Sequence, residues 1–202
     1  MTKNKCGVRF MSISLSLLVA SGVTTIPRIF LPVNLRAVPK MLAMIPSVIR
    51  GVGTHDLERI KIIAREAYPA VAQLSIEVLS EWMQGSGLAS LFVVDVRAPK
   101  EFAVSHLHGA INLQTADQIA RAVTRQDPNK TILYCSVGFR SSRLAHLVAQ
   151  RGVPNVFNLE GSIFQWANEG NEIYQGEKRV QQVHPYGRRW IGLLKQGLAS
   201  DC

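Results

Sequence analysis

Residues 131–152 read TILYCSVGFRSSRLAHLVAQRG, a pattern in which a strand runs into a short loop and then into a helix. The run 131–134 predicts a strand. A helix is predicted over 141–151, because Gly152 with a proline two residues beyond it is a normal stop signal. Cys135 directly follows the strand. The stretch therefore places a cysteine at the carboxyl end of a strand, in the loop that leads into a helix.

The same alternation extends along the chain on both sides of this stretch. The almost wholly apolar run LFVVDV predicts a strand that is covered on both faces. The predicted strands are 91–96, 110–113, 131–134 and 156–159, and the predicted helices start near residues 75, 99, 115, 141 and 162. Strands and helices that alternate at this spacing predict an α/β fold, with a mainly parallel central sheet and helices on both faces.

Cys135 lies where such a sheet binds ligands, at the carboxyl ends of its strands. The N–H groups of a tight loop and of a helix start are unpaired and can hold an anion. The helix start and the neighbouring Arg140 and Arg143 favour the thiolate over the thiol. Gly138 allows the backbone to turn back on itself. A nucleophile inside an anion-binding loop suits reactions on small oxyanions or sulfur anions.

Three motifs in this order resemble the rhodanese-like sulfurtransferases over about residues 75–175. The second motif is the loop 135–140 with two serines after it, and the third spans 155–170, with Leu159, Gly161 and Trp166 among its residues. The first motif consists of Asp95-Val96-Arg97, Glu101-Phe102, His106-Leu107, Gly109-Ala110 and Asn112. Two positions depart from the family pattern: Ser105 precedes the histidine where glycine is common, and Ser162 replaces a second glycine after Leu159.

The resemblance implies a rhodanese-like domain with a parallel sheet of about five strands, and transfer of sulfur through a persulfide on Cys135. Its implied partners are a small donor such as thiosulfate and an acceptor that is a thiol, a protein thiol or, in the test tube, cyanide. The loop residues Ser136, Val137, Gly138, Phe139 and Arg140 would bind the anion. Neither a metal nor an organic cofactor is implied.

The resemblance also implies a rival, a phosphatase of the cell-division-cycle type that uses the same fold. Its loop is longer by one residue, because a tetrahedral phosphate needs a wider ring of donors. Four residues separate Cys135 from Arg140, and Tyr134 stands where the phosphatase pattern has histidine. Loop length therefore favours sulfur.

A second alternative is a non-catalytic module that uses the fold to bind a partner. Such modules commonly lose the cysteine, whereas this chain keeps both Cys135 and Arg140. The apolar loop residues Val137 and Phe139 hint at a bulky thiol or a protein as the acceptor.

The flanking residues of the first motif also have structural interpretations. We expect Asp95 and Arg97 to support the loop by pairing near its base. Glu101 and His106 are expected to be hydrogen-bond partners rather than an acid and a base, because a thiolate that attacks a sulfur donor needs no general base.

The net charge of +9 arises at the ends of the chain. Residues 1–55 hold seven basic residues and no acid, whereas residues 75–175 hold eight basic and nine acidic residues. A nucleic-acid reader usually carries its basic face on the folded domain, so nucleic acid is not expected as a partner. The sequence divides into a basic N-terminal segment (1–55), an amphipathic helix (56–74), the rhodanese-like domain (75–175) and a tail (176–202).

The N-terminal segment combines basic residues with an apolar stretch over 10–26. It fits a signal peptide, an organelle transit peptide, a weak membrane anchor or a mis-called start, and a cytoplasmic location is the remaining alternative. We expect it to direct the protein to a place without adding to catalysis. The other two cysteines, Cys6 and Cys202, have neither disulfide nor zinc-ligand spacing.

Overall fold

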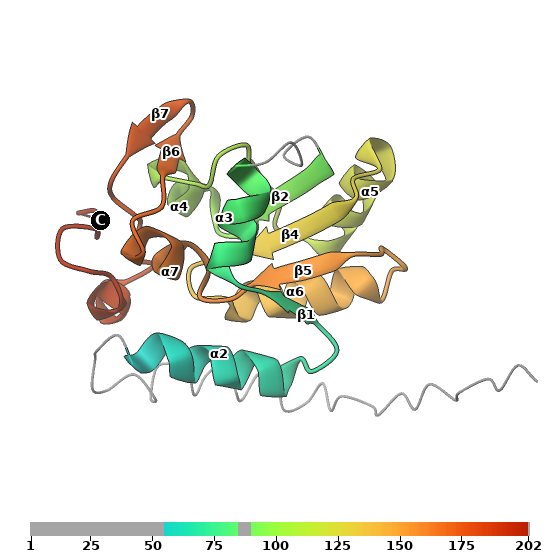
Figure 1. Ribbon diagram of the computed structural model, residues 1–202, viewed down its shortest axis with the longest axis horizontal. Coiled ribbons are helices and arrows are strands. Elements are labelled where there is room, and N and C mark those ends of the chain that lie inside the picture. Colours follow the sequence, from blue (N-terminus) through green and yellow to red (C-terminus); the bar gives the residue numbers. More distant parts are fainter. Residues whose placement is uncertain (1–54, 85–89, 202) are drawn as a thin grey trace, which may run out of the picture. The chain divides into compact units, whose positions relative to one another are not determined.

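The computed structural model describes residues 55–84 and 90–201. At its centre lies a five-stranded sheet in the order β1-β5-β4-β2-β3, with every neighbouring pair parallel (Figure 1). The strands are β1 (Ala72–Leu74), β2 (Leu91–Asp95), β3 (Ile111–Asn112), β4 (Lys130–Tyr134) and β5 (Val156–Leu159). The predicted fold class, a mainly parallel sheet of about five strands, is confirmed.

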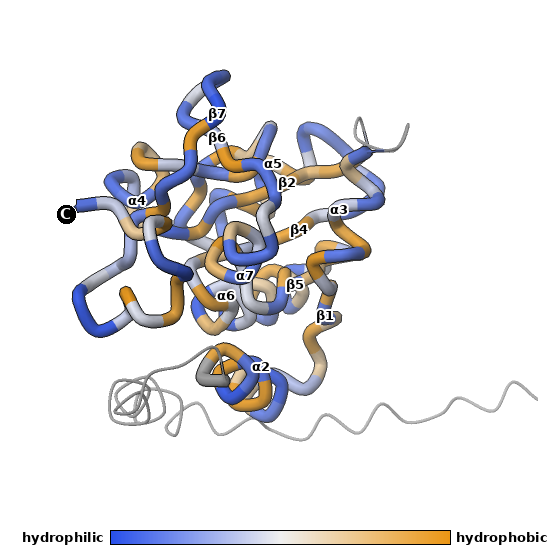
Figure 2. The backbone as a smooth tube through the Cα atoms, turned by 60° about the vertical axis from the view of Figure 1, so that its left-hand side comes forward, coloured by the Kyte–Doolittle hydropathy of each residue, from blue (hydrophilic) through white to orange (hydrophobic). Residues whose placement is uncertain are grey.

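Helices cover both faces of this sheet because its strands are apolar on both faces. Val93 and Ile132 belong to the core cluster that includes α3 (Ile76–Gln84) and α7 (Ser162–Asn168). Val94 and Leu133 belong to the cluster that includes α5 (Ala116–Gln126) and α6 (Phe139–Ala149). In Figure 2 the turn between β6 (Ile173–Gln175) and β7 (Lys178–Val180), which lies outside these layers, is hydrophilic. The other two α-helices of the described residues are α2 (His55–Ala67) and α4 (Pro99–Val104).

The register of β2 and β4 brings two loops together at the carboxyl edge of the sheet. Asp95, the last residue of β2, lies opposite Tyr134, the last residue of β4. The segment that follows β2 leads into α4, and the segment that follows β4 leads into α6. The residues just after these two strands therefore leave the sheet side by side, which is where Cys135 lies.

The sequence does not predict three short strands. β1 has only three residues, and it pairs with β5 just before residue 75. The strands β6 (Ile173–Gln175) and β7 (Lys178–Val180) form an antiparallel hairpin across residues 176–177. The described residues of the segments 56–74, 75–175 and 176–202 share one core, because Ile60 of α2 and Leu193 of the tail lie in the same apolar cluster as Ile132.

The tail is held on the domain by its backbone. Val183 pairs with the segment near residue 199, and a 3-10 helix, η2, spans Arg188–Leu193. Asn168 at the end of α7 donates its side-chain amide to Leu193 O at 2.7 Å and accepts the N–H of Lys195 at 2.8 Å. This side chain therefore fixes the tail at two backbone groups.

The N-terminal segment predicted over 1–55 lies outside the described residues except for its last residue. Within 55–84 and 90–201 no helix has the length and apolar character needed to cross a membrane.

Asn168→Ala is expected to lower the free energy of unfolding by about 1–3 kcal/mol, because it removes two hydrogen bonds and leaves two backbone groups of the tail without their partner. Urea unfolding would measure the loss. Asn129→Ala is the matched control, since the Asn129 side chain is exposed and makes no hydrogen bond among the described residues. Equal stability of the two variants would contradict the role given to Asn168.

Candidate active site

The loop after β4 is anchored to the first turn of α7. The backbone N–H of Cys135 donates to Ser162 Oγ at 3.1 Å, and Cys135 O accepts the N–H of Ile163 at 3.2 Å. Ser136 O accepts the N–H of Phe164 at 3.1 Å. These bonds fix the start of the loop from both sides of the cysteine, so the position of the thiol is set by backbone geometry.

The loop closes on the sulfur atom at Gly138. The N–H of Gly138 donates to Cys135 Sγ at 3.2 Å. Gly138 has φ 99° and ψ −12°, a left-handed backbone that disfavours any residue with a Cβ. The glycine is therefore needed for the turn that aims an N–H at the sulfur.

The environment of Cys135 favours its thiolate. Burial of the 1% exposed side chain raises the thiol pKa, but the charge of Arg140 and hydrogen bonds from Ser141 and from the Val137 backbone outweigh burial and lower the pKa of Cys135 below its ordinary value. The Ser141 hydroxyl is buried and makes no hydrogen bond of normal geometry among the described residues, so no partner other than the sulfur competes for it. Arg143, which was also expected to favour the thiolate, is exposed and is not among these main causes.

Arg140 is held by a buried carboxylate. Its guanidinium donates to both oxygens of Glu101, at 3.1 and 2.9 Å, and to Ser136 Oγ at 2.9 Å. Ser136 Oγ in turn donates to Glu101 at 3.2 Å, and the N–H of Ala98 donates to Glu101 at 3.0 Å. Burial raises the pKa of Glu101, but the bond to Arg140 and its charge prevail and lower that pKa overall. Glu101 is therefore the side chain that orients Arg140.

Asp95 and Arg97 form a separate, fully buried pair. Arg97 donates from Nε and Nη2 to the Asp95 carboxylate at 2.7–3.0 Å and from Nη2 to Ser105 O at 2.6 Å. His106 is hydrogen-bonded at both ring nitrogens, with Leu107 O and with the N–H of Gly176. The structure thus places Asp95 and Arg97 in a pair that holds the segment at Ser105, whereas the contact with the loop is made by Glu101.

Val137 and Phe139 do not form the apolar acceptor surface that their sequence suggested. They are 5% and 2% exposed and belong to the core cluster. Phe139 packs edge-on against Tyr68, which follows α2, with ring centroids 5.7 Å apart. These side chains anchor the loop in the core, so only the backbone groups of the two residues can face an anion.

The two sites where the chain departs from the family pattern have different structural roles. Ser162 has φ 49°, so it adopts the backbone of the glycine that it replaces. Its hydroxyl donates to Leu159 O at 2.9 Å while accepting the N–H of Cys135, which joins the end of β5 to the reactive loop. Ser105 is fully buried, and its hydroxyl has no partner among the described residues.

The structure gives Glu101 and Ser162 roles that the sequence does not predict. From the sequence, Glu101 is expected only to be a hydrogen-bond partner. The available signal was a carboxylate in the first turn of the helix that follows β2, the strand beside β4. Ser162 was visible only as a departure from glycine, and nothing in its residue type predicted a bond to Cys135.

The fold and the loop together define an α/β protein with a cysteine at the carboxyl edge of a parallel sheet, and the surroundings of this cysteine stabilise its thiolate. The family model of the Rhodanese-like domain matches residues 75–169. The chain is also 33% identical over 72 residues to thiosulfate sulfurtransferase PspE of Escherichia coli, covering 67% of that protein and 34% of this one. The chain belongs to the rhodanese-like family.

Other relatives match the same domain within proteins of different length. An uncharacterized protein of Bacillus subtilis, YqhL, is 28% identical over 97 residues, which are 48% of this chain and 77% of that one. A tRNA uridine(34) hydroxylase of Teredinibacter turnerae is 29% identical over 107 residues, but the chain spans only 33% of its length. A thiosulfate sulfurtransferase of Pseudomonas aeruginosa has the same fold, with a TM-score of 0.50 and 22% identity over 59% of this chain and 23% of that one.

Arg140→Gln is expected to raise the pKa of Cys135, because the charge of Arg140 is the strongest influence that lowers it. The measurement is a pH titration of thiolate absorbance in a protein that carries Cys6→Ser and Cys202→Ser, so that Cys135 is the only thiol. Adding Arg140→Gln to this protein should move the rise in absorbance to higher pH. Arg143→Gln removes an equal charge from the exposed face and should leave the titration in place. A shift of equal size in both variants would show a general charge effect and contradict the assignment. Near-UV circular dichroism checks that each variant is folded.

Ser162→Ala and Ser162→Gly are expected to separate the two roles of this residue. Both variants remove the hydroxyl that accepts the Cys135 N–H, at a cost of about 1–3 kcal/mol. Only glycine also relieves the left-handed backbone, which costs about 1–2 kcal/mol in other residues. Ser162→Ala should therefore be the less stable variant in urea unfolding, and the reverse order would show that the backbone is not strained.

Proposed function

We propose that this protein is a sulfurtransferase that carries a sulfur atom as a persulfide on Cys135. The observation that carries the proposal is the loop closure, in which the Gly138 N–H points at Cys135 Sγ from 3.2 Å beside a fixed Arg140. A thiolate in such a loop can act as a nucleophile, and the loop N–H groups can then bind the anionic persulfide that it forms.

The first half-reaction would load the cysteine. The Cys135 thiolate attacks the outer sulfur of thiosulfate, the sulfur–sulfur bond of the donor breaks, and sulfite leaves with the bonding electron pair. The product is an anionic persulfide, so the negative charge moves from Cys135 Sγ to the added sulfur. The loop N–H groups and the charge of Arg140 would stabilise it in that place.

The second half-reaction would return the cysteine to its starting state. An acceptor thiolate, or cyanide, attacks the outer sulfur of the persulfide, and the bond between the two sulfur atoms breaks. The acceptor leaves as its own persulfide or as thiocyanate, and Cys135 is again a thiolate. The cycle balances without an external oxidant or reductant, and neither step calls for a general base, a metal or an organic cofactor.

Two features support sulfur transfer over phosphate hydrolysis. The loop has one residue fewer between Cys135 and Arg140 than the phosphatase pattern. Arg140 also directs its paired N–H groups at Glu101, so they are not available for bidentate binding of a phosphate. Arg140 would therefore act on the sulfur chemistry through its charge.

A non-catalytic role is disfavoured by the electrostatics of the site. A protein that uses this fold only for binding has no need to lower the pKa of a buried thiol. Here Arg140, Glu101 and Ser136 form a connected set of hydrogen bonds beside Cys135. Such a set supports an anion at the loop.

Incubation with excess thiosulfate is expected to add one sulfur atom to the protein, and cyanide should remove it as thiocyanate. Intact mass spectrometry reports the adduct directly. Cys135→Ala should abolish both the adduct and thiocyanate formation, whereas Cys6→Ser and Cys202→Ser should retain them. An adduct that survives in Cys135→Ala, or hydrolysis of an aryl phosphate faster than sulfur transfer, would contradict the proposal.

A further inference from the structure

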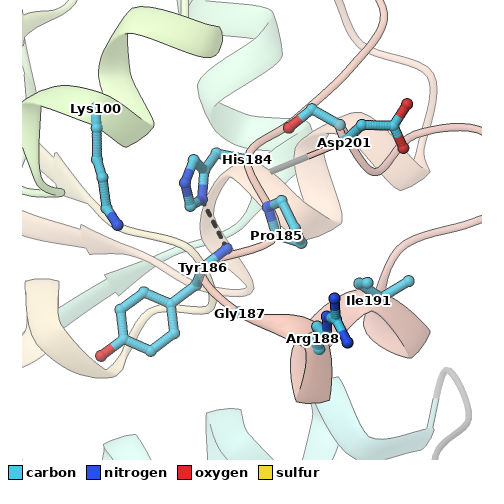
Figure 3. A pocket seen from close by; sticks show the side chains of 9 residues that line it. Lys100, His184, Pro185, Tyr186, Gly187, Arg188, Ile191 and Asp201 are labelled. Atoms are coloured by element: carbon cyan, nitrogen blue, oxygen red, sulfur yellow. Dashed lines mark hydrogen bonds between the residues drawn. The ribbon is translucent and has the colours of Figure 1, made fainter.

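A pocket of about 670 Å³ opens between α4 and the tail (Figure 3). Lys100 of α4 lines one side, and residues of the tail line the rest. In Figure 3, Lys100 and Arg188 lie on opposite sides of His184 and Pro185. The function proposed above uses none of these side chains.

The pocket is joined to the reactive loop through Tyr186. The Tyr186 ring lines the pocket, and the Arg140 guanidinium lies over it with Cζ 4.7 Å from the ring centroid. On the α4 side, Lys100 is the neighbour in sequence of Glu101, which holds Arg140. The pocket therefore begins where the site around Cys135 ends.

The charges that line the pocket are mainly positive. Lys100 and Arg188 are exposed, and neither forms an ion pair within the described part of the chain. His184 accepts the N–H of Tyr186 at Nδ1, and its burial lowers its pKa, which favours the neutral ring. Asp201 supplies the only carboxylate among the lining residues. Two cations against one anion favour an anionic ligand.

The size of the pocket fits a ligand larger than thiosulfate. Thiosulfate consists of a few atoms, and its charge is met by the loop and Arg140. A pocket of about 670 Å³ is in the range that binds molecules of some hundreds of daltons. The larger partner in the proposed reaction is the acceptor. The buried side chains of Val137 and Phe139 offer no acceptor surface, whereas this pocket adjoins the loop through Tyr186 and Arg140.

We propose that the tail pocket binds the acceptor, a small thiol that carries carboxylates at a distance from its sulfur. Lys100 and Arg188 would bind the carboxylates, and the thiol would pass Tyr186 to reach the Cys135 persulfide. The acceptor thiolate then takes the outer sulfur, and Cys135 recovers its electron pair, as in the second half-reaction. This inference rests on the proposed function and adds the acceptor class and its site.

Two peptides of equal size test the inference: acetyl-Glu-Cys-Gly, which carries two carboxylates, and acetyl-Gln-Cys-Gly-amide, which carries none. The protein is loaded with thiosulfate, freed of excess donor and mixed with each peptide, and the loss of the added sulfur is followed by mass. Two weakly screened ion pairs predict a preference of about fivefold or more for the acidic peptide at low salt. The preference should fall as salt rises.

Charge-changing variants distinguish binding in the pocket from a general effect of the protein's charge. Lys100→Gln with Arg188→Gln should remove the preference, whereas Asp201→Asn should increase it. Arg189→Gln with Lys195→Gln removes the same charge from exposed tail positions that do not line the pocket, and it should leave both the preference and the cyanide rate unchanged. Equal rates for the two peptides with the unmodified protein, or equal losses in the two double variants, would overturn the inference.

A thiol-free peptide separates this result from a failure of the proposed function. Binding of acetyl-Glu-Ser-Gly, measured by calorimetry, needs no persulfide. We expect it to weaken about fivefold or more in the Lys100→Gln, Arg188→Gln variant. If no persulfide forms but this binding is observed, sulfur transfer is wrong and the anion site stands. If a persulfide forms and the peptide does not bind, the pocket assignment is wrong and sulfur transfer stands.

Discussion

A buried thiolate must be compensated by charge and by hydrogen bonds, because an ion removed from water without partners costs several kcal/mol. Cys135 is 1% exposed, and its compensation comes from Arg140 and from N–H groups of its own loop. The guanidinium in turn is balanced by Glu101, which is itself 1% exposed. The Cys135 thiolate therefore depends on Arg140, and the position of Arg140 depends on Glu101.

This dependence fixes the surrounding backbone. Glu101 must enter from α4, which follows β2, and Cys135 from the loop that follows β4, so the two strands have to be neighbours in parallel register. The loop must also turn sharply enough to aim an N–H at its own sulfur, and Gly138 supplies that turn. The first turn of α7 then takes up the carbonyl groups that the turn leaves behind. The order of β2 and β4 in the sheet thus determines which charges surround Cys135 Sγ.

The sequence predicted the parts of this arrangement that depend on local pattern. Alternating apolar runs located β2, β4 and β5, and the loop with its cysteine and glycine predicted an anion-binding turn. The sequence does not predict which side chains form contacts between distant segments of the chain. Glu101 and Arg140 are 39 residues apart, and Cys135 and Ser162 are 27 apart, so their bonds follow from strand register rather than from spacing. The three residues of β1 carry too little pattern to indicate a strand, and the inward direction of Val137 and Phe139 could not be read from their apolar character.

The part of the chain that matches the family ends at residue 169, and this limit divides the site physically. Cys135 and the ion pair of Glu101 and Arg140 beside it lie inside the matched range. Tyr186 lies outside it, in a tail held by Asn168 and by apolar burial. Because the Tyr186 ring lies against the Arg140 guanidinium, the tail contacts the one charge on which the thiolate depends most. A change at Tyr186 would therefore act on the surroundings of Arg140 as well as on what approaches the loop, so the environment of Cys135 depends on residues outside the matched range.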